Sequence, residues 1–430
     1  MMASAIFQVQ ADEFLSKALS WSKGFDQLCL FESNGFQSPY AQVERMLAVG
    51  AQAVFTPKAG ESTFEQLAHF KSRYPDSWMP GFLSYDLKNE LEELQTQHPN
   101  RIGFPDAYFF VPRILIQFEK NQVNISSEIE DPAAVYQQII SHHPLSPSYT
   151  FKGQVKARMS QAEYFKAFYG IKNHIQLGDI YEANLCQEFY DDEAFIDHPE
   201  ALFLRLNSLS PTPFACLFKI EDAYILSASP ERFLAKRGTT LISQPIKGTS
   251  ARGKDEQEDA RLKELLLNNP KEIAENVMIV DLVRNDMTRS AVPGTVRVTE
   301  KLGLYTFKHV HQLISTISCE KDPALSDCQV IQNTFPAGSM TGAPKISAMQ
   351  LCDQYENSRR GVYSGAIGYF APTGDFDFNV VIRTILYNRS KQYLSFHTGG
   401  AITMDAEAEK EYAECMTKAS AILSALGQSL

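Results

Sequence analysis

The sequence predicts an α/β protein of the α+β kind, with layered sheets and helices rather than a helical bundle. Two observations predict this class. Short runs rich in β-branched and aromatic residues recur along the chain and indicate strands. Longer segments between them repeat apolar residues every three to four positions, as helices do. The length of 430 residues, 44% of them hydrophobic, allows more than one core.

The best domain boundary is segment 141–153, which is rich in Pro and Ser. It separates an N-terminal region, residues 1–145, from a second region that covers residues 155–425. The N-terminal region contains strand-like runs at 27–33 and 108–119, with polar helical patches between them. The strand-like runs of the second region are residues 223–234, 239–248, 365–372, 378–388 and 393–402.

Three helices are expected in the second region. The first starts near Pro270, a residue suited to the first helical turn. The second follows a glycine-rich corner and covers residues 346–356. The third begins after Asp405, a plausible N-cap, and extends to residue 426. The third helix has one apolar face, made of Tyr412, Met416, Ala419, Leu423 and Leu426.

The bulk composition excludes several classes of function. A formal net charge of −11 argues against nucleic acid or an anionic membrane as the main partner, because both need a basic surface. No apolar run reaches the ~18 residues of a membrane span, and the N-terminus lacks the pattern of a signal peptide. The seven cysteines are scattered and never form C-x-x-C. We therefore expect reduced thiols and a cytoplasmic protein.

Two pairs of glutamates could form a cation site. Glu272 and Glu275 are three residues apart on the first helix, and Glu411 and Glu414 are three apart on the last, so each pair shares a helix face. Carboxylates from two helices would suit Mg²⁺, which keeps some waters for a substrate. Acidic residues near helix starts also interact with the helix dipole and face solvent, and the spacing alone favours that interpretation.

Anion-binding features lie elsewhere in the second region. The corner 337–345 precedes a helix whose N–H groups could receive an anion, and residues 397–402 carry two glycines after a strand-like run. Both could be ordinary turns. Arg383 lies within an apolar run and must pair with something: a substrate carboxylate and a structural salt bridge are equally compatible with the sequence.

Glu231 and Lys247 form a candidate acid/base and nucleophile pair. They lie sixteen residues apart, and two adjacent strands joined by a turn near residues 236–240 would bring them to one edge. A lysine attacks at neutral pH only if its pKa falls below ~10.4, which burial near few carboxylates would achieve. A plain ion pair is the simpler interpretation of these two residues alone.

Taken together, these segments resemble the chorismate-utilising enzymes. The motifs occur in the family's order and cover roughly residues 155–425: "SPERF", "PIKGT", "AENVMIVDLVRND", "FPAGSMTGAPK", "RRGVYSGAIGYF", "VVIRTI", "TGGAI" and "EYAECMTKA". The resemblance implies a layered α/β/β/α architecture around two orthogonally packed β-sheets. It also implies that the N-terminal region wraps the catalytic region.

The resemblance assigns roles to many of these residues. Glu231 matches the family's general acid/base, which helps the 4-hydroxyl of chorismate to leave. The implied Mg²⁺ ligands are Glu272, Glu275, Glu411 and Glu414. The implied chorismate-binding residues are Arg383, Tyr363, Gly399, Gly400, Ala401, Thr249, Ser339 and Lys345. Segments near the N-terminus and at 210–214 resemble a tryptophan pocket, with Ser33, Tyr40, Pro213 and Phe214.

Within the family, Lys247 distinguishes the branches. "PIKGT" is similar to the branch that forms 4-amino-4-deoxychorismate, where the lysine bonds to C2 of chorismate and ammonia then adds at C4. The anthranilate-forming branch resembles "PIAGT" instead. Water-adding relatives carry a lysine at the position of Glu182, which disfavours isochorismate formation. The resemblance therefore implies chorismate and ammonia as substrates, a glutamine amidotransferase subunit as the source of ammonia, and a place in p-aminobenzoate and folate synthesis.

The sequence departs from the family at one notable position. Relatives commonly have a histidine before Leu-Val-Ser, whereas this chain has Gln312 there, preceded by His311. Glutamine can form hydrogen bonds but cannot shuttle a proton. Two alternatives follow: an enzyme of the anthranilate-forming branch, which Lys247 opposes, and a tryptophan-binding relative without catalysis, which the retained glutamates oppose.

Overall fold

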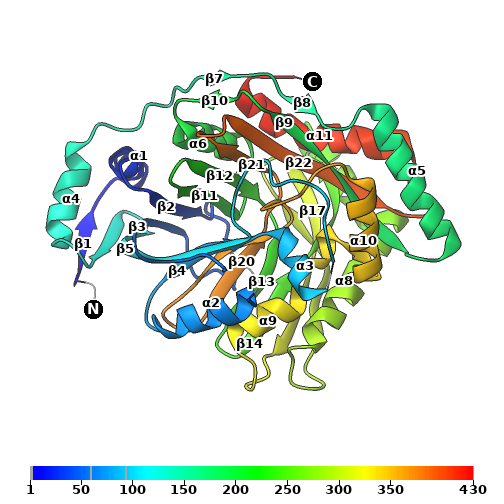
Figure 1. The fold of residues 1–430 in the computed structure, drawn as a ribbon, viewed down its shortest axis with the longest axis horizontal. Coiled ribbons are helices and arrows are strands. Elements are labelled where there is room, and N and C mark those ends of the chain that lie inside the picture. Colours follow the sequence, from blue (N-terminus) through cyan, green and yellow to red (C-terminus); the bar gives the residue numbers. More distant parts are fainter. Residues whose placement is uncertain (1–2, 59–60, 93, 430) are drawn as a thin grey trace.

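The computed structural model describes residues 3–58, 61–92 and 94–429. The helices are α1 Ala11–Ser22, α2 Thr63–Ser72, α3 Lys88–Leu91, α4 Pro132–Ser141, α5 Gln161–Leu177, α6 Pro199–Leu209, α7 Glu256–Leu267, α8 Pro270–Thr288, α9 Asp327–Thr334, α10 Lys345–Tyr355 and α11 Ala408–Leu426, with short 3₁₀ turns at Tyr85–Leu87 and Gly338–Met340. Strands form the centre of the molecule, and helices lie around them (Figure 1).

Apart from a short β7–β10 pair, the described strands form one continuous antiparallel network. Because β5 pairs with both β3 and β4, the network divides there into two layers, here called the first and second sheet. The first sheet contains β1 Ala3–Gln8, β2 Gln27–Glu32, β3 Arg45–Phe55, β5 Ala107–Glu119, β6 Gln122–Ser127, β8 Lys156–Ala157, β9 Glu182–Asp191, β11 Phe214–Ile220, β12 Ala223–Ser229, β18 Gly342–Ala343, β21 Thr384–Asn388 and β22 Tyr393–Ile402. The second contains β4 Met79–Leu83, β13 Arg232–Arg237, β14 Thr240–Gln244, β15 Ile246–Ala251, β16 Arg297–Thr306, β17 Val310–Glu320, β19 Ala366–Phe370 and β20 Phe376–Val380. The short pair is β7 Phe151–Lys152 with β10 Phe195–Ile196.

Three large apolar clusters separate the layers, and a smaller one packs α5 and α10 on β9. One, with Phe82, Phe110, Phe218 and Ile367, lies between strands of the two sheets. A second fills the space between the first sheet and α1, α4, α6 and α11. The third packs α2, α8 and α9 on the second sheet. The order is therefore helices, sheet, sheet, helices, as the resemblance implied.

The N-terminal region contributes strands to both sheets. β2 pairs with β11, and β4 pairs with β19, so strands on both sides of segment 141–153 share hydrogen bonds. The N-terminal region therefore packs into the rest of the molecule. The boundary between residues 1–145 and 155–425 stays a prediction.

Several expectations about individual elements need correction. The last helix begins at Ala408 with Glu407 at its N-cap, so Asp405 lies before it and does not cap it. Residues 378–388 form two strands instead of one, and Arg383 lies between them with φ +52°. The glycines at 399 and 400 lie inside β22 rather than in a corner after a strand.

Other expectations are confirmed. Helix α8 begins at Pro270, and Asn269 caps it by accepting a hydrogen bond from the backbone N–H of Lys271. All seven cysteines are buried and free. Within the described residues, no helix has both the length and the apolar character needed to cross a membrane.

Candidate active site

Two adjoining cavities lie between α8, α11 and the strands β15 and β22. The larger, here called the main cavity, has a volume of about 590 Å³, and the smaller, the inner pocket, about 140 Å³. Six residues line both: Ile246, Lys247, Thr249, Arg383, Ala401 and Lys418. The main cavity also takes in Glu272, Glu275, Glu411 and Glu414, and the inner pocket Glu231, Ser339, Tyr363, Gly399 and Gly400. The fold thus gathers nearly all of the predicted site residues.

A β-bulge brings Lys247 to these cavities. Strand β15 pairs with β17 at Ile246 and again at Thr249, but the register shifts between them. Lys247 and Gly248 form this irregularity, and Gly248 adopts φ +97°, which favours glycine. The strand therefore continues through Lys247 and Gly248 as far as Ala251. Asn276 of α8 donates a 3.4 Å hydrogen bond to the backbone carbonyl of Lys247.

Glu231 reaches the inner pocket from the link between β12 and β13. The hairpin of β13 and β14 is antiparallel, and β15 follows it at once, so Glu231 and Lys247 return to the same region of the sheet. Glu231 is 5% exposed, and burial raises the pKa of its carboxyl to about 7. A carboxyl with this pKa holds a proton for much of the time at neutral pH, as a general acid must.

Lys247 is surrounded by more carboxylates than we expected. Its Nζ lies 2.8 Å from Oε1 of Glu182, the first residue of β9. Burial lowers the pKa of Lys247, but the charges of Glu182 and Glu275 outweigh burial, so its pKa is raised. The expected environment with few carboxylates is therefore absent, and the resting amine carries its proton.

Arg383 presents a cation that has no acidic partner among the described residues. Burial alone accounts for the lowered pKa of its guanidinium, and the ion pairs of the described chain do not include it. Of the two explanations left open by the sequence, a structural salt bridge is excluded within that part of the chain. Its left-handed backbone, φ +52°, is costly for an arginine, as strained residues at ligand sites often are.

The two glycines of β22 allow close approaches. A Cβ on Gly399 would lie 2.3 Å from the backbone oxygen of Leu185 on β9. A Cβ on Gly400 would lie 2.7 Å from Oε2 of Glu411 on α11. Glycine is therefore needed at 399 for strand packing, and at 400 to leave room for a carboxylate.

The four glutamates form an acidic wall in which Glu411 is buried, Glu272 and Glu275 are half-buried and Glu414 is exposed. Glu411 is only 3% exposed, so it does not face solvent as residues near helix starts often do. Burial raises the pKa of Glu272 and Glu411, and raises that of Glu275 to about 7. Burial would also raise the pKa of the Glu414 carboxyl, but the ammonium group of Lys418 at 2.8 Å has the larger effect and lowers this pKa. Crowded acids, three of them with raised pKa values, fit a hard cation such as Mg²⁺.

An ammonium group of the chain itself, on the exposed side chain of Lys271, already contacts this wall. Nζ of Lys271 lies 3.2 Å from Oε1 of Glu411 and 3.7 Å from Oε1 of Glu275, and so links α11 to α8. Across the described residues, no three His, Cys, Asp or Glu side chains gather tightly enough to hold a metal ion as they stand. The donor chemistry fits a cation, but the glutamates would have to close around it.

A comparison with protein families shows the family to which the chain belongs. The family of chorismate binding enzymes matches residues 27–424, which is nearly the whole chain. The chain is a chorismate-binding enzyme. This assignment agrees with the resemblance seen in the motifs, and it includes most of the N-terminal region as well.

Similar proteins carry two different names. Aminodeoxychorismate synthase component 1 of Salmonella typhimurium is 35% identical over 80% of this chain and 75% of its own length. Anthranilate synthase component 1 of Thermus thermophilus is 32% identical over 91% of this chain and 87% of its own length. The crystal structure of anthranilate synthase component I from Streptococcus pneumoniae has a TM-score of 0.76 at 25% identity, covering 90% of this chain and 93% of that one.

One predicted substrate-binding residue of this chorismate-binding enzyme lies away from the cavities. Nζ of Lys345 contacts Asp286 of α8 at 3.0 Å and the carbonyl oxygen of Thr334 at 2.9 Å. Lys345 thereby fastens the start of α10 to α8 and lines neither cavity. Its place in the loop was visible in the sequence, but the distant Asp286 that holds it was not.

The departure from the family at position 312 lies inside the inner pocket. Gln312 is buried, and its Oε1 has no hydrogen-bond partner among the described residues. The preceding His311 cannot replace the missing histidine, because it points into the core. There its Nε2 lies 2.8 Å from Oδ1 of Asp259, and its Nδ1 3.0 Å from Thr306.

Three site residues escaped the sequence analysis. Glu182 was noted only as the position of a lysine in relatives, whereas it contacts Lys247. Lys418 lines both cavities and lies beside Glu414. His397 is buried in the inner pocket and stacks on Tyr363 with ring centroids 4.9 Å apart. The glycine-rich motif that contains His397 was the only available signal for it.

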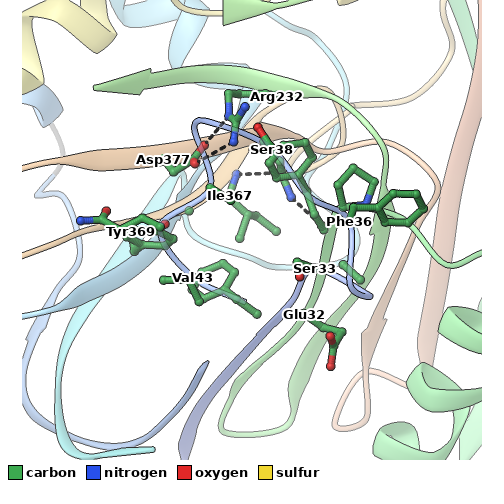
Figure 2. A pocket seen from close by; sticks show the side chains of 17 residues that line it. Glu32, Ser33, Phe36, Ser38, Val43, Arg232, Ile367, Tyr369 and Asp377 are labelled. Carbon is green, nitrogen blue, oxygen red and sulfur yellow. Dashed lines mark hydrogen bonds and ion pairs between the residues drawn. The ribbon is translucent and has the colours of Figure 1, made fainter. Parts of the chain in front are cut away.

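The predicted tryptophan pocket corresponds to a separate cavity of about 60 Å³ (Figure 2). Ser33, Pro213 and Phe214 line it, whereas Tyr40 lies beside it and accepts a 2.9 Å hydrogen bond from Arg237 through its backbone oxygen. At one side Arg232 and Asp377 form a buried ion pair with a 3.0 Å contact. A volume this small holds only a few waters, and tryptophan binding stays a prediction.

Proposed function

We propose that this chorismate-binding enzyme is an aminodeoxychorismate synthase component 1, which converts chorismate and ammonia to 4-amino-4-deoxychorismate. The observation that carries the proposal is Lys247, an amine held at the junction of the two cavities with the protonatable Glu231 lining the same pocket. Relatives of that name, 31 to 35% identical, support it. The product would enter p-aminobenzoate and folate synthesis.

The chemistry is two allylic displacements. The amine of Lys247 bonds to C2 of chorismate while the C4–O bond breaks, and Glu231 gives its proton to the departing hydroxyl, which leaves as water. Ammonia then bonds to C4, the C2–N bond breaks, and Lys247 leaves as an amine. The new ammonium at C4 returns a proton to Glu231, so the cycle closes.

The remaining site residues would bind and orient chorismate. Arg383 offers a free planar fork for a carboxylate, and the backbone of Gly399 and Gly400 offers close approach on the facing strand. The glutamates at 272, 275, 411 and 414 would hold Mg²⁺. When bound, this ion would neutralise the acidic wall and bind the ring carboxylate of chorismate.

The name component 1 implies a second subunit. Relatives so named support a partner, component II, which would be a glutamine amidotransferase that delivers ammonia. The seven free, buried thiols support a reducing compartment, and we place the reaction in the cytoplasm.

Product analysis tests the proposal. The chain is incubated with chorismate, Mg²⁺ and ammonium, and the products are separated and weighed by mass spectrometry. We expect 4-amino-4-deoxychorismate. Fluorescent anthranilate as the sole product would identify an anthranilate synthase component I instead, a candidate favoured by the Thermus relative that matches 91% of the chain. Tryptophan binding without any product would identify a non-catalytic relative.

A further inference from the structure

The most telling contact that the proposed function leaves unused is the one between Glu182 and Lys247. Oε1 of Glu182 lies 2.8 Å from Nζ of Lys247, and the two side chains are only 8% and 12% exposed. The residues come from β9 and β15, which do not pair, so the ion pair is no consequence of strand register. Glu182 has no other ion-pair partner within the described chain.

We propose that Glu182 is the catalytic base that takes the proton from the ammonium group of Lys247 before it attacks chorismate. This inference rests on the proposed function and deepens it. An ammonium has no lone pair, so Lys247 cannot bond to carbon until this proton has left. At 2.8 Å the carboxylate of Glu182 is within direct reach of that proton.

Filling the cavity with substrate would drive the transfer. While water fills the cavity, the charged pair is favoured, because water molecules beside the pair help to solvate both ions. When chorismate displaces water, the cost of keeping two buried charges rises, and the pair of neutral amine and neutral acid becomes comparable in energy. The proton moves from Nζ to the carboxylate within an existing hydrogen bond, so no solvent path is needed.

The two carboxyls next to Lys247 then have opposite starting states. Glu231 begins as the acid and protonates the leaving hydroxyl, whereas Glu182 begins as the carboxylate and accepts a proton from the nucleophile. After the second displacement releases the amine, Lys247 recovers its proton from Glu182. The net reaction consumes chorismate and ammonia and yields aminodeoxychorismate and water, so neither residue is changed over the cycle.

Other charges around Lys247 are less well placed for this role. Glu231 precedes β13, Glu272 and Glu275 come from α8, and Glu414 comes from α11. Only Glu182 forms a hydrogen bond to Nζ among the described residues. The three glutamates of the helices belong to the acidic wall proposed to hold Mg²⁺, which would engage their charge.

The test compares the wild-type chain with Glu182→Gln. Chorismate and Mg²⁺ are added without ammonia, and the rate at which a covalent adduct forms is followed by intact-mass measurement between pH 6.5 and 9. Asp327→Asn serves as the matched control, because Asp327 is also a little-exposed carboxylate paired with lysines, Lys236 at 2.6 Å and Lys71 at 3.0 Å, but lies outside both cavities. Glu182→Asp retains a carboxylate and checks for rescue.

We expect the wild-type chain to exceed Glu182→Gln by about 10²-fold at pH 6.5, the usual effect of a general base. The ratio of the wild-type rate to the variant rate should fall as pH rises, because hydroxide in the solvent then removes the proton of Lys247 that glutamine cannot accept. Both chains contain Glu231, so the titration of this residue changes the two rates alike and leaves their ratio unchanged. Asp327→Asn should match the wild type, and Glu182→Asp should recover part of the rate.

Several results would overturn the inference. A ratio that stays constant with pH, whatever its size, would show that Glu182 only positions the lysine. Faster adduct formation in Glu182→Gln would show that the carboxylate restrains the nucleophile. If the wild-type chain itself forms no adduct, the covalent mechanism is wrong and the inference is wrong with it. If the wild-type chain and Glu182→Gln form the adduct at the same rate, only the proposed role of Glu182 is wrong.

Discussion

At the scale of single residues, the state of Glu231 links burial to catalysis. Burial raises the pKa of its carboxyl to about 7 in the folded chain, against an ordinary value near 4.3. The neutral form is therefore the one that the fold favours. The same burial that costs stability when Glu231 ionises also keeps the proton that the leaving hydroxyl needs.

This leads to a prediction for Glu231→Gln. A raised folded pKa means that the stabilising contribution is full below the unfolded pKa and is lost as pH rises through about 7. Glutamine cannot ionise, so the variant should be as stable as the wild type at pH 3.5, below the unfolded pKa, and up to about 3 kcal/mol more stable at pH 9. Urea unfolding at both pH values measures the difference, and equal stabilities at pH 9 would contradict it.

The site residues whose neighbours could be predicted are those that lie near one another in the sequence. Glu231 and Lys247 were placed together because a hairpin joins them, and the fold does join them so. Glu182 could not be recognised as a partner, because β9 lies 65 residues away from Lys247 in the sequence. Lys345 was predicted to bind substrate from its loop alone, but a distant carboxylate holds it elsewhere.

At the scale of elements, α8 and α11 approach each other through opposite charges. Their glutamates were predictable from spacing, since each pair lies three residues apart on a helix. The lysine that links them was not singled out, because Lys271 looks like an ordinary first-turn residue. In the structure its ammonium group lies 3.2 Å from Glu411, near where a bound cation would have to sit.

We therefore predict that Lys271→Met binds Mg²⁺ more tightly than the wild type. A metal ion entering the wild-type site must displace the ammonium group from Glu411 and Glu275. The Lys271 side chain is 45% exposed, so the gain should be modest, about three- to tenfold in Kd, as for a solvent-exposed ion pair. Calorimetric titration with MgCl₂ in the absence of chorismate measures it.

Lys263→Met is the matched control for this measurement. Lys263 forms a similar ion pair, 3.2 Å from Asp259, on a helix outside the cavities, and its replacement should leave Mg²⁺ binding unchanged. Equal Mg²⁺ binding by Lys271→Met would show that Lys271 does not compete with the cation, and weaker binding would show that Lys271 helps the acidic wall to bind cations.

At the scale of the whole molecule, the two regions of the sequence share both sheets. Layering could be predicted from alternating strand-like and helical segments. The pairing of β2 with β11 and of β4 with β19 could not, because it joins segments separated by more than 180 residues. The Pro- and Ser-rich segment 141–153 links the end of α4 to β7 within these shared layers.

A truncation tests whether the two regions fold as one cooperative unit. A chain that begins at residue 146 would lose β2 and β4 and leave β11 and β19 as bare, apolar edges. We predict that this fragment aggregates or lacks a cooperative thermal transition, whereas the full chain unfolds in one transition. A soluble fragment with its own sharp transition would instead support residues 155–425 as an independent domain.

The central claim is that Lys247 is the nucleophile, and mass spectrometry tests it most directly. The full-length chain is mixed with chorismate and Mg²⁺ without ammonia, quenched and weighed, and the modified peptide is then located. We predict a mass increase equal to chorismate less one water, carried by the peptide that contains Lys247 and absent from Lys247→Ala. An adduct that persists in Lys247→Ala, or a wild-type chain that turns over chorismate to aminodeoxychorismate without one, would contradict the account.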